Sequence, residues 1–367
     1  MNILYLTTHL NIGGITSYLL TLTAGLKSRG HNVYIASWGG ETVSRFREKG
    51  ITIIPIPIKT KSEISPKVLL SFCKLLPVIK KEHIDIIHCN SRVTQVLGCL
   101  LSSFSRKPFI STCHGFFKTR FSRRTFPCWG KKVIAISQQV KTHLMQDFNV
   151  QEEDIVVINN GVDVKKPKDD GRETRDEIKK RFNLKQCPVV GIIGRLSDVK
   201  GHIYLIEAMK KVLEKNPEAQ LFIVGEGRMK DKIISLIKKL NIEKQAVIIP
   251  SVADTAAVLP IIDLFVMPSL KEGLGLSLME AMAAGLAVIG SDVGGIKSLI
   301  QHNHTGLLVK PADSQGLSNA ILELLDDSQK RKTLGDNARE FIARNFSAEQ
   351  MVNFTEKAYN DCLKWIS

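Results

Sequence analysis

Residues 268–285 read Pro268-Ser-Leu-Lys-Glu272-Gly-Leu-Gly-Leu-Ser-Leu-Met-Glu280-Ala-Met-Ala-Ala-Gly285. Two glutamates stand eight positions apart around a glycine-rich turn that leads into a helix-forming stretch. The glycines allow the backbone to approach a ligand closely, and the free N–H groups at the start of the helix favour an anion. The two carboxylates accept hydrogen bonds from hydroxyl groups. A diphosphate flanked by two polyols fits this pattern, and the alternative is a capped amphipathic helix with a solvent-facing glutamate at each end.

The same half of the chain alternates strands and helices. A strand is expected at Ile262–Met267, directly before this turn, and another at Val189–Ile193. The second strand runs into a turn that carries Arg195 and Lys200, which can bracket a diphosphate, Arg as a planar fork and Lys as a point charge. The expected strand 220–224 ends in Gly225-Glu226-Gly227. This alternation predicts an α/β fold with a parallel, doubly wound sheet, and ligands of such sheets bind at the strand-to-helix turns.

A first α/β unit precedes the second. An apolar strand at Ile3–Thr7 is followed by Gly13-Gly14, an amphipathic helix and a strand at 32–37. A further strand, from Phe109, ends in His114-Gly115. A Gly-Gly pair can equally mark a plain tight turn, and a single histidine at a strand end is more often structural.

The charge of the chain is unevenly distributed. Residues 1–170 hold 24 Lys and Arg against 12 Asp and Glu, whereas the remainder holds 27 against 24. No acidic residue occurs between Ile86 and Gln146, where basic residues alternate with aromatic ones. This window predicts contact with an anionic membrane surface or an anionic acceptor, through four residues: Lys118, Arg120, Arg123 and Arg124. A solvated basic face is the alternative, and nucleic acid is the least favoured partner because no nucleic-acid motif accompanies the charge.

The 272–280 segment resembles the Glu-x7-Glu signature of retaining glycosyltransferases of family 4, also called group 1. The resemblance extends over most of the chain. It implies the GT-B fold, in which two Rossmann-like domains face each other across a cleft and the C-terminal helix crosses back to the first domain. The implied domains are an acceptor-binding domain at 1–168, a nucleotide-sugar-binding domain at 169–345, and the returning helix at 346–367.

The resemblance also implies roles for individual residues. Catalysis is assigned to Arg195 and Lys200, which stabilise the leaving diphosphate, to Glu272 against the sugar ring, and to His114. Glu280 would accept hydrogen bonds from the ribose. The remaining donor-binding positions are Gly13, Gly14, Gly194, Gly225, Gly227, Gly273, Leu274 and Gly275.

The expected reaction transfers a sugar from a nucleoside-diphosphate sugar, UDP ahead of GDP, to a glycan or lipid-linked acceptor of cell-surface polysaccharide synthesis. No carboxylate pair is evident for double displacement, so same-face attack on the sugar is favoured. No metal-ligand cluster is visible in the sequence, and neither a metal nor another cofactor is expected. The alternatives are a sugar-nucleotide epimerase, with His9, His88 and His114 as the acid–base candidates, and a catalytically inactive scaffold.

Compartment and membrane character follow from two further observations. The seven cysteines are scattered, odd in number and without a Cys-x-x-Cys pair, as is typical of reduced thiols in the cytosol. No stretch of about 20 apolar residues predicts a transmembrane helix. The sequence therefore favours a cytoplasmic protein, peripheral on the inner face of a membrane if the basic window binds lipid.

Overall fold

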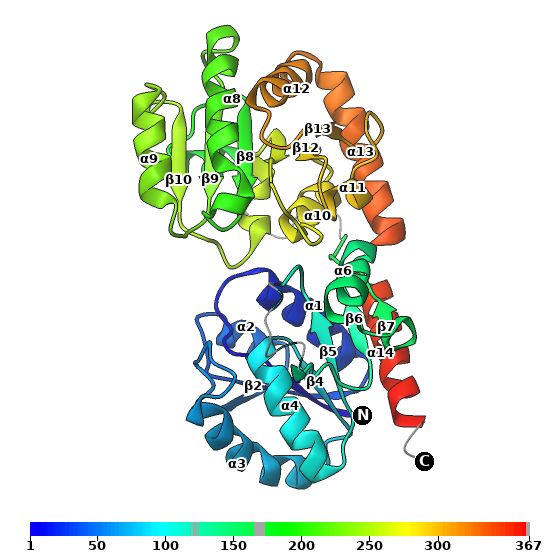
Figure 1. The fold of residues 1–367 in the computed structure, drawn as a ribbon. Helices are drawn as coiled ribbons and strands as arrows, with labels where there is room; N and C mark the ends of the chain where they lie inside the picture. The colour runs from blue at the N-terminus through cyan, green and yellow to red at the C-terminus, as the bar shows by residue number, and fades with distance from the viewer. Residues whose placement is uncertain (118, 120–122, 124, 165–172, 365–367) are drawn as a thin grey trace. The chain divides into compact units, whose positions relative to one another are not determined.

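The computed structural model describes residues 1–117, 119, 123, 125–164 and 173–364. The chain divides into two compact units, one formed by Met1–Gly161 with Ala348–Ser367 and the other by Val162–Ser347. These divisions differ by a few residues from the expected boundaries after 168 and 345. Figure 1 shows a sheet with helices around it in each unit.

The first unit is a seven-stranded parallel sheet in the order β3-β2-β1-β4-β5-β6-β7. Its strands are β1 (Asn2–Leu6), β2 (Asn32–Ser37), β3 (Thr52–Pro55), β4 (Ile86–Cys89), β5 (Phe109–Cys113), β6 (Val133–Ala135) and β7 (Ile155–Val157). Its helices are α1 (Gly14–Ser28), α2 (Val43–Glu48), α3 (Pro66–Lys81), α4 (Arg92–Ser105), α6 (Gln138–Phe148) and α14 (Ala348–Lys364), with the short 3-10 helix η1 (Glu152–Asp154).

The second unit is a six-stranded parallel sheet in the order β10-β9-β8-β11-β12-β13. Its strands are β8 (Val189–Ile193), β9 (Gln220–Val224), β10 (Ala246–Ile249), β11 (Leu264–Met267), β12 (Ala287–Ser291) and β13 (Leu307–Val309). Its helices are α7 (Arg175–Arg181), α8 (His202–Lys215), α9 (Lys230–Lys239), α10 (Leu276–Ala283), α11 (Ile296–Leu299), α12 (Ser314–Asp326) and α13 (Ser328–Asn345), with 3-10 turns at Asp198–Lys200, Thr255–Ala257 and Leu259–Ile261.

Both sheets change the direction of strand order beside their first strand. In the second unit, β8 pairs with β9 on one side and with β11 on the other. In the first unit, β1 lies between β2 and β4. A crevice opens outside the carboxyl ends of the strands at such a switch point, because the flanking connections leave in opposite directions. The two sheets therefore each position one set of strand-to-helix turns for a ligand.

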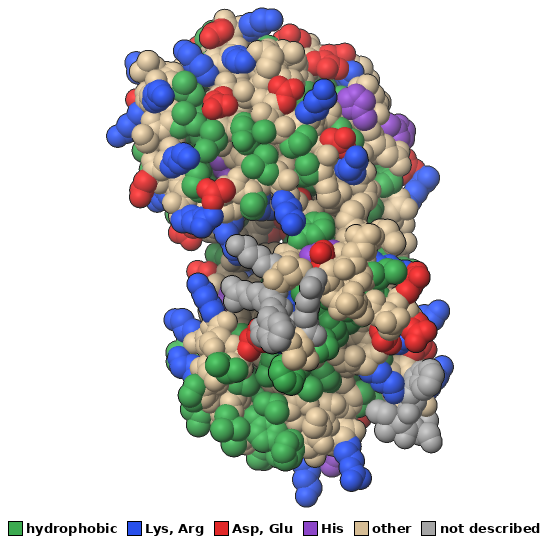
Figure 2. All heavy atoms as spheres, in the orientation of Figure 1, with side chains coloured by type: hydrophobic (Ala, Val, Ile, Leu, Met, Phe, Trp, Pro, Cys, Tyr) green, Lys and Arg blue, Asp and Glu red, His purple; other side chains and the backbone are tan. Residues whose placement is uncertain are grey.

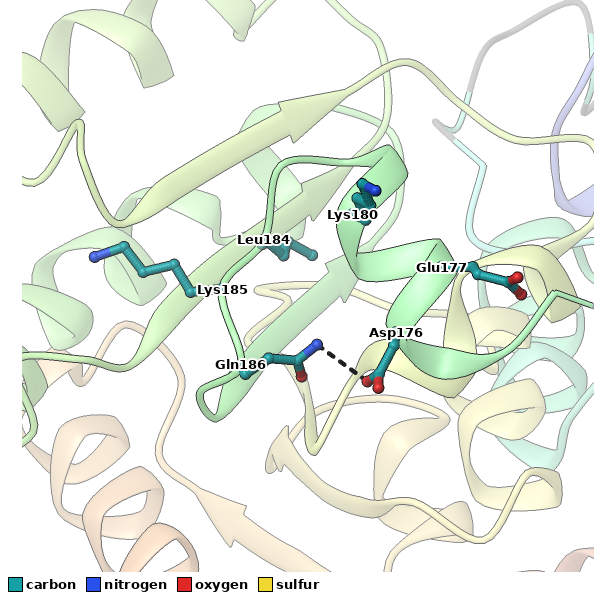
Figure 3. Close-up of a pocket in the computed structure, with 6 residues that line it drawn as sticks. All are labelled: Asp176, Glu177, Lys180, Leu184, Lys185 and Gln186. Atoms are coloured by element: carbon teal, nitrogen blue, oxygen red, sulfur yellow. Dashed lines mark hydrogen bonds between the residues drawn. The ribbon is translucent and has the colours of Figure 1, made fainter.

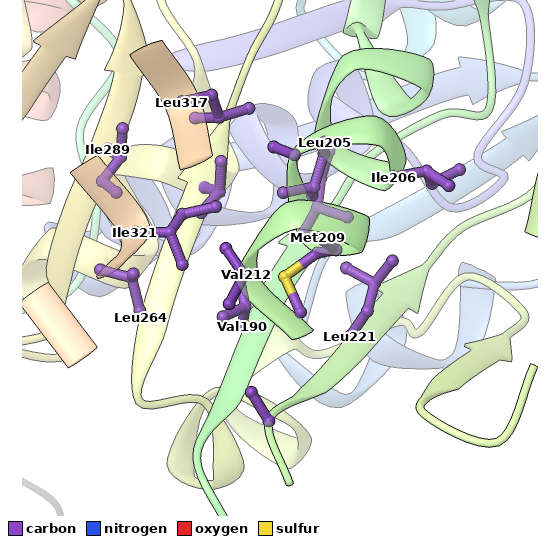
Figure 4. Packing of buried hydrophobic residues seen from close by; sticks show 14 of the residues in the cluster. Val190, Leu205, Ile206, Met209, Val212, Leu221, Leu264, Ile289, Leu317 and Ile321 are labelled. Atoms are coloured by element: carbon purple, nitrogen blue, oxygen red, sulfur yellow. The ribbon is translucent and has the colours of Figure 1, made fainter. Parts of the chain in front are cut away.

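A continuous apolar core makes the second sheet a rigid base for its turns. Fully buried strand residues such as Val190, Leu221 and Leu264 pack against Leu205 and Met209 of α8, as Figure 4 shows. The inner strands β8, β9 and β11 are buried along their length, which explains their continuous apolar runs in the sequence.

The last helix belongs to the first unit, as the resemblance implies. On α14, Val352 packs against Gly25 of α1, where an added Cβ would come within 2.5 Å of Val352 Cγ2. The fully buried Tyr359 hydroxyl lies 2.5 Å from Tyr5 Oη and 2.6 Å from His88 Nδ1. The second ring nitrogen of His88 lies 2.7 Å from Thr112 Oγ1. A buried polar network thus joins α14 to β1, β4 and β5, and its members satisfy one another's hydrogen-bonding groups.

Two histidines of the first unit are held neutral by burial, and we therefore expect the stability of the fold to decrease at acidic pH. Burial, with a smaller contribution from the charge of His114, lowers the pKa of His88 to about 3, and burial lowers the pKa of His114 to about 3. An unfolded chain binds these protons near pH 6.5, so the unfolding free energy falls as pH drops below about 6.5, by up to about 1.4 kcal/mol per pH unit for each histidine.

Thermal melts at about pH 7.5 and about pH 5 would measure this loss. We expect a lower melting temperature at the acidic pH and a shallower pH dependence for His88→Gln. The exposed His83 provides the control, because His83→Gln should leave the pH dependence unchanged. If the melting temperature of His88→Gln depended on pH as steeply as that of the wild type, the lowered pKa of His88 would be contradicted.

Candidate functional site

The turns after β8 and β11 carry an ion pair at the switch point of the second sheet. Lys200 Nζ donates a hydrogen bond to Glu272 Oε2, and both side chains are largely buried. The two turns are also joined by the backbone, because Leu270 N donates to Val199 O at 2.8 Å. The structure therefore brings together two of the four predicted catalytic residues, which are 72 positions apart in the sequence.

Arg195 follows β8 on the same turn and is exposed. Among the described residues, its side chain makes no hydrogen bond or ion pair, so its guanidinium is available to an incoming anion. Glu280 lies within α10 and is half-buried. It is therefore not the solvent-facing glutamate that the alternative interpretation of this segment requires.

The start of α10 presents backbone rather than a side-chain cap. Gly275 precedes the helix in the left-handed conformation, at φ 94° and ψ 67°, and no side chain caps the helix. Ser277 Oγ donates to Ile193 O at 2.8 Å, which fixes the first turn of α10 against the end of β8. The uncapped N–H groups and the positive end of the helix dipole favour an anion here. Gly273 and Leu274 are buried in the turn just before.

Gly225 and Gly227 serve the packing of two turns. A Cβ on Gly225 would lie 2.0 Å from Gly194 O, and one on Gly227 would lie 2.3 Å from Leu196 O. The turn after β9 also bonds to the turn after β8, since Leu196 N donates to Glu226 O at 2.9 Å. These two glycines thus support the loop that carries Arg195, in addition to any contact with a ligand. Gly194 itself has only ordinary neighbours, the nearest 3.9 Å from an added Cβ.

Three further glycines, for which the sequence predicted no role, shape the site. A Cβ on Gly201 would lie 1.8 Å from Pro268 O, and one on Gly294 would lie 2.1 Å from Glu272 O. Gly295 N donates to Glu272 O at 3.0 Å, and a Cβ on Gly295 would lie 2.3 Å from Gly273 O. The Gly294-Gly295 pair shortly after β12 is the sequence signal that could have indicated this close approach.

The first unit places its predicted residues at the corresponding edge of its own sheet. Gly13 precedes α1 and Gly14 begins it, and a Cβ on either would meet nothing within 4 Å. No packing contact among the described residues requires these glycines, which leaves room for a ligand. Glu41, which the sequence analysis did not single out, accepts a hydrogen bond from Ile12 N at 2.9 Å and holds the loop before them.

His114 follows β5 at this edge and is ordered by two neighbours. Its Nε2 lies 3.1 Å from Asn90 Oδ1, and its ring meets the Tyr18 ring edge-on at a centroid distance of 4.8 Å. The lowered pKa keeps its imidazole neutral, so it is suited to hydrogen bonding rather than to charge. His88, another histidine considered for acid–base chemistry, is fully buried with both ring nitrogens hydrogen-bonded, which removes it as an acid–base candidate.

The basic window differs from the expectation at Arg123. This side chain was expected on an exposed acceptor or membrane surface, but it is buried, with its guanidinium carbon 4.0 Å from the centre of the Phe117 ring. Stacking on aromatic faces explains why an arginine is tolerated there. Lys118, Arg120 and Arg124 lie outside the described residues.

A hollow in the second unit lies away from these turns. Figure 3 shows it beside α7, lined by charged side chains of both signs, with Gln186 Nε2 donating to Asp176 Oδ1 at 3.0 Å. Its residues 184–186 immediately precede β8, so it lies at the amino ends of the strands. Ligands of doubly wound sheets bind at the opposite edge, and we assign this hollow no function.

No group of three His, Cys, Asp or Glu side chains among the described residues is arranged to hold a metal ion. None of the described helices combines the length and the apolar character that crossing a membrane requires.

Comparison with known proteins agrees with this geometry. Residues 174–341 match the model of the glycosyl transferases group 1, and residues 12–166 match that of glycosyltransferase family 4. One relative is the UDP-Gal:alpha-D-GlcNAc-diphosphoundecaprenol alpha-1,3-galactosyltransferase of Escherichia coli, 29% identical over 80% of this chain and 79% of the relative. Another is the N-acetyl-alpha-D-glucosaminyl L-malate synthase of Bacillus anthracis, 25% identical over 98% and 97%.

The fold is likewise similar to that of solved glycosyltransferase structures. The crystal structure of Anabaena HepE in complex with UDP-glucose superposes with a TM-score of 0.85 at 23% identity, covering 98% of this chain and all of that one. The architecture is therefore GT-B, with two Rossmann-like domains. The chain belongs to glycosyltransferase family 4, also called group 1, and is a glycosyltransferase.

Proposed function

We propose that the protein is a retaining glycosyltransferase that transfers a sugar from a UDP-sugar to a glycan or lipid-linked acceptor in cell-surface polysaccharide synthesis. The observation that carries this proposal is the largely buried Lys200–Glu272 pair at the carboxyl ends of β8 and β11, with the exposed Arg195 on the same turn as Lys200. The pair combines a cation for phosphate with a carboxylate for sugar hydroxyls.

Each side chain takes one part of the donor. Arg195 and Lys200 bind the diphosphate, and Glu272 accepts hydrogen bonds from the sugar hydroxyls. Glu280 accepts them from the ribose, and the backbone of 273–275 with the uncapped start of α10 binds the phosphate nearest the sugar. In the first unit, Gly13, Gly14 and the neutral His114 contact the sugar or the acceptor.

UDP is proposed as the nucleotide because of the relatives. The E. coli relative uses UDP-Gal by its name, and the HepE structure contains UDP-glucose. The same E. coli enzyme acts on a sugar linked to diphosphoundecaprenol, which supports a lipid-linked acceptor for this chain. The seven cysteines are all free, as in reducing compartments, and we place the protein in the cytoplasm.

Retention is proposed to occur by attack on the face that the nucleotide leaves. The bond between the sugar C1 and the phosphate oxygen breaks, and the acceptor oxygen forms a bond to C1. The acceptor proton passes to the departing phosphate. Arg195 and Lys200 stabilise the negative charge that develops there, so the reaction is proposed to need no metal ion.

Donor hydrolysis tests this function without knowledge of the acceptor. Incubation with α-linked UDP-glucose or UDP-galactose should release the sugar first as its α anomer, which proton NMR resolves before mutarotation. The rate should be unchanged by EDTA and should fall for Lys200→Ala. Initial release of the β anomer would contradict retention, and loss of activity with EDTA would contradict metal independence. If nothing is released while the nucleotide still binds, the inactive-scaffold alternative gains support.

A further inference from the structure

The outer surface of α3 and α4 in the first unit has an unusual composition. On α3, Val68, Ser71, Leu75 and Ile79 face inward and are buried. The opposite side of a surface helix is normally polar, but here Leu69 and Leu70 are exposed. On α4, one turn apart, Leu100 and Phe104 are exposed as well.

These side chains form one continuous surface. The Phe72 ring of α3 meets the Phe104 ring of α4 edge-on at a centroid distance of 5.1 Å, which joins the two helices. Ile64, just before α3, is 93% exposed. Figure 2 shows hydrophobic side chains gathered over α3 and α4 on this side of the unit. We call the surface of Ile64, Leu69, Leu70, Phe72, Leu100 and Phe104 the α3–α4 face.

The surroundings of the α3–α4 face are basic. No acidic residue occurs between Ile64 and Lys81, or anywhere in α4. Lys67, Lys74 and Lys81 are exposed at seven-residue intervals along α3, which places them on one side of the helix. Lys81 lies 3.8 Å from Glu82, which follows the helix, so Lys67 and Lys74 provide most of the positive charge. The nearest acidic side chain before α3, Glu63, is engaged in an ion pair with Arg92 at 2.8 Å.

We propose that the α3–α4 face docks onto an anionic lipid bilayer. Contiguous exposed apolar side chains indicate an interaction surface, and the lysines beside them identify the partner by charge. Leucine and phenylalanine side chains enter the boundary between head groups and acyl chains, while lysines contact lipid phosphates. The same lysines can extend their methylene stems along the apolar surface.

This proposal places the membrane contact on different residues from those that the sequence indicates. Of the four residues indicated at 118–124, the described Arg123 is buried. Helix α3 lies before the acid-free window of 86–146, and the exposed residues of α4 lie within that window but outside 118–124. The docking surface does not depend on the donor, the acceptor or the stereochemistry of transfer. Vesicle binding without nucleotide therefore tests it separately from the proposed function.

The test is cosedimentation of the full-length protein with vesicles of phosphatidylglycerol and phosphatidylcholine, compared with phosphatidylcholine alone. We expect binding to the anionic vesicles that weakens as salt is added. Phe104→Gln should weaken it about tenfold or more, and Lys74→Gln should weaken it about fivefold. Both side chains are exposed, so Lys74→Gln should leave the melting temperature unchanged. Phe104→Gln, which loses the ring contact with Phe72, should lower it only slightly.

Matched controls come from α14 of the same unit. Phe354 is 55% exposed, comparable to the 68% of Phe104, and lies outside the α3–α4 face. Phe354→Gln and Lys357→Gln should bind vesicles like the wild type. The proposal is overturned if the wild type does not bind anionic vesicles at low salt, or if the control variants lose binding equally. It is also overturned if the protein is a dimer that Phe104→Gln dissociates, since the face would then be a subunit interface.

Discussion

Replacement of Arg195 by alanine is expected to lower kcat/KM for donor turnover by about 100- to 1,000-fold. Arg195 is exposed at the carboxyl end of β8, on the turn that also carries Lys200 of the Lys200–Glu272 pair. In the folded protein without ligand its side chain makes no hydrogen bond or ion pair among the described residues, so its loss should cost little stability. In the proposed mechanism, its positive charge stabilises the departing diphosphate in the transition state.

Donor hydrolysis and thermal melting, measured on the same preparations, separate these effects. Arg195→Lys should recover part of the activity, because the charge remains while the bidentate geometry is lost. Arg181→Ala is the matched control, since Arg181 is exposed on α7 and pairs with Glu173 away from the strand ends. Unchanged kcat/KM in Arg195→Ala would remove this residue from the mechanism, and an equal loss in Arg181→Ala would show that the effect is not specific.

A second large effect is expected for Gly201→Ala, this time on stability. Gly201 has φ 71°, and an added Cβ would lie 1.8 Å from Pro268 O. Left-handed backbone at a residue with a side chain costs about 1–3 kcal/mol, and overlap in a packed region adds about 1–3 kcal/mol. The unfolding free energy of the second unit should therefore fall by roughly 3 kcal/mol. The turns of Lys200 and Glu272 should also separate, which lowers activity.

Gly194→Ala is the control within the same turn. Its added Cβ would have no neighbour closer than 3.9 Å, so its stability should equal that of the wild type. Chemical denaturation that follows the second unit measures both variants. Equal stability of Gly201→Ala and the wild type would contradict the close approach of the turns after β8 and β11.

Much of this fold could be predicted because its signals are local. The strands at 32–37, 189–193 and 220–224 are short apolar runs bounded by turn residues, and they occur where the sequence places them. The three-residue edge strand β13 and helix α3 were not predicted. A strand of three residues has too little periodicity to detect. On α3, apolar residues occupy both the buried and the exposed side, which obscures the amphipathic pattern.

The charged residues of the candidate site could be predicted from their side-chain chemistry. The glycines whose role depends on backbone contacts between turns were harder to predict. Charged residues at strand ends indicated Arg195, Lys200 and Glu272 from the sequence. Gly225 and Gly227 are needed partly because the neighbouring turn packs closely against them. That packing depends on distances across the sheet, which the sequence alone does not show. The burial of Arg123 could not be predicted for a similar reason. A run of basic and aromatic residues suggests an exposed face, but in the structure the guanidinium stacks on an aromatic ring and is buried.

The central claim is that the carboxyl ends of β8 and β11 bind a nucleoside diphosphate. The most direct measurement is the thermal stability of the wild type and of Arg195→Ala in the presence of UDP, GDP and ADP. At about 100 times its dissociation constant, a bound nucleotide adds about 2.7 kcal/mol to the unfolding free energy. We predict selective stabilisation of the wild type by UDP and its loss in Arg195→Ala. No stabilisation by any of the three nucleotides, or an equal shift in Arg195→Ala, would contradict this account of the site.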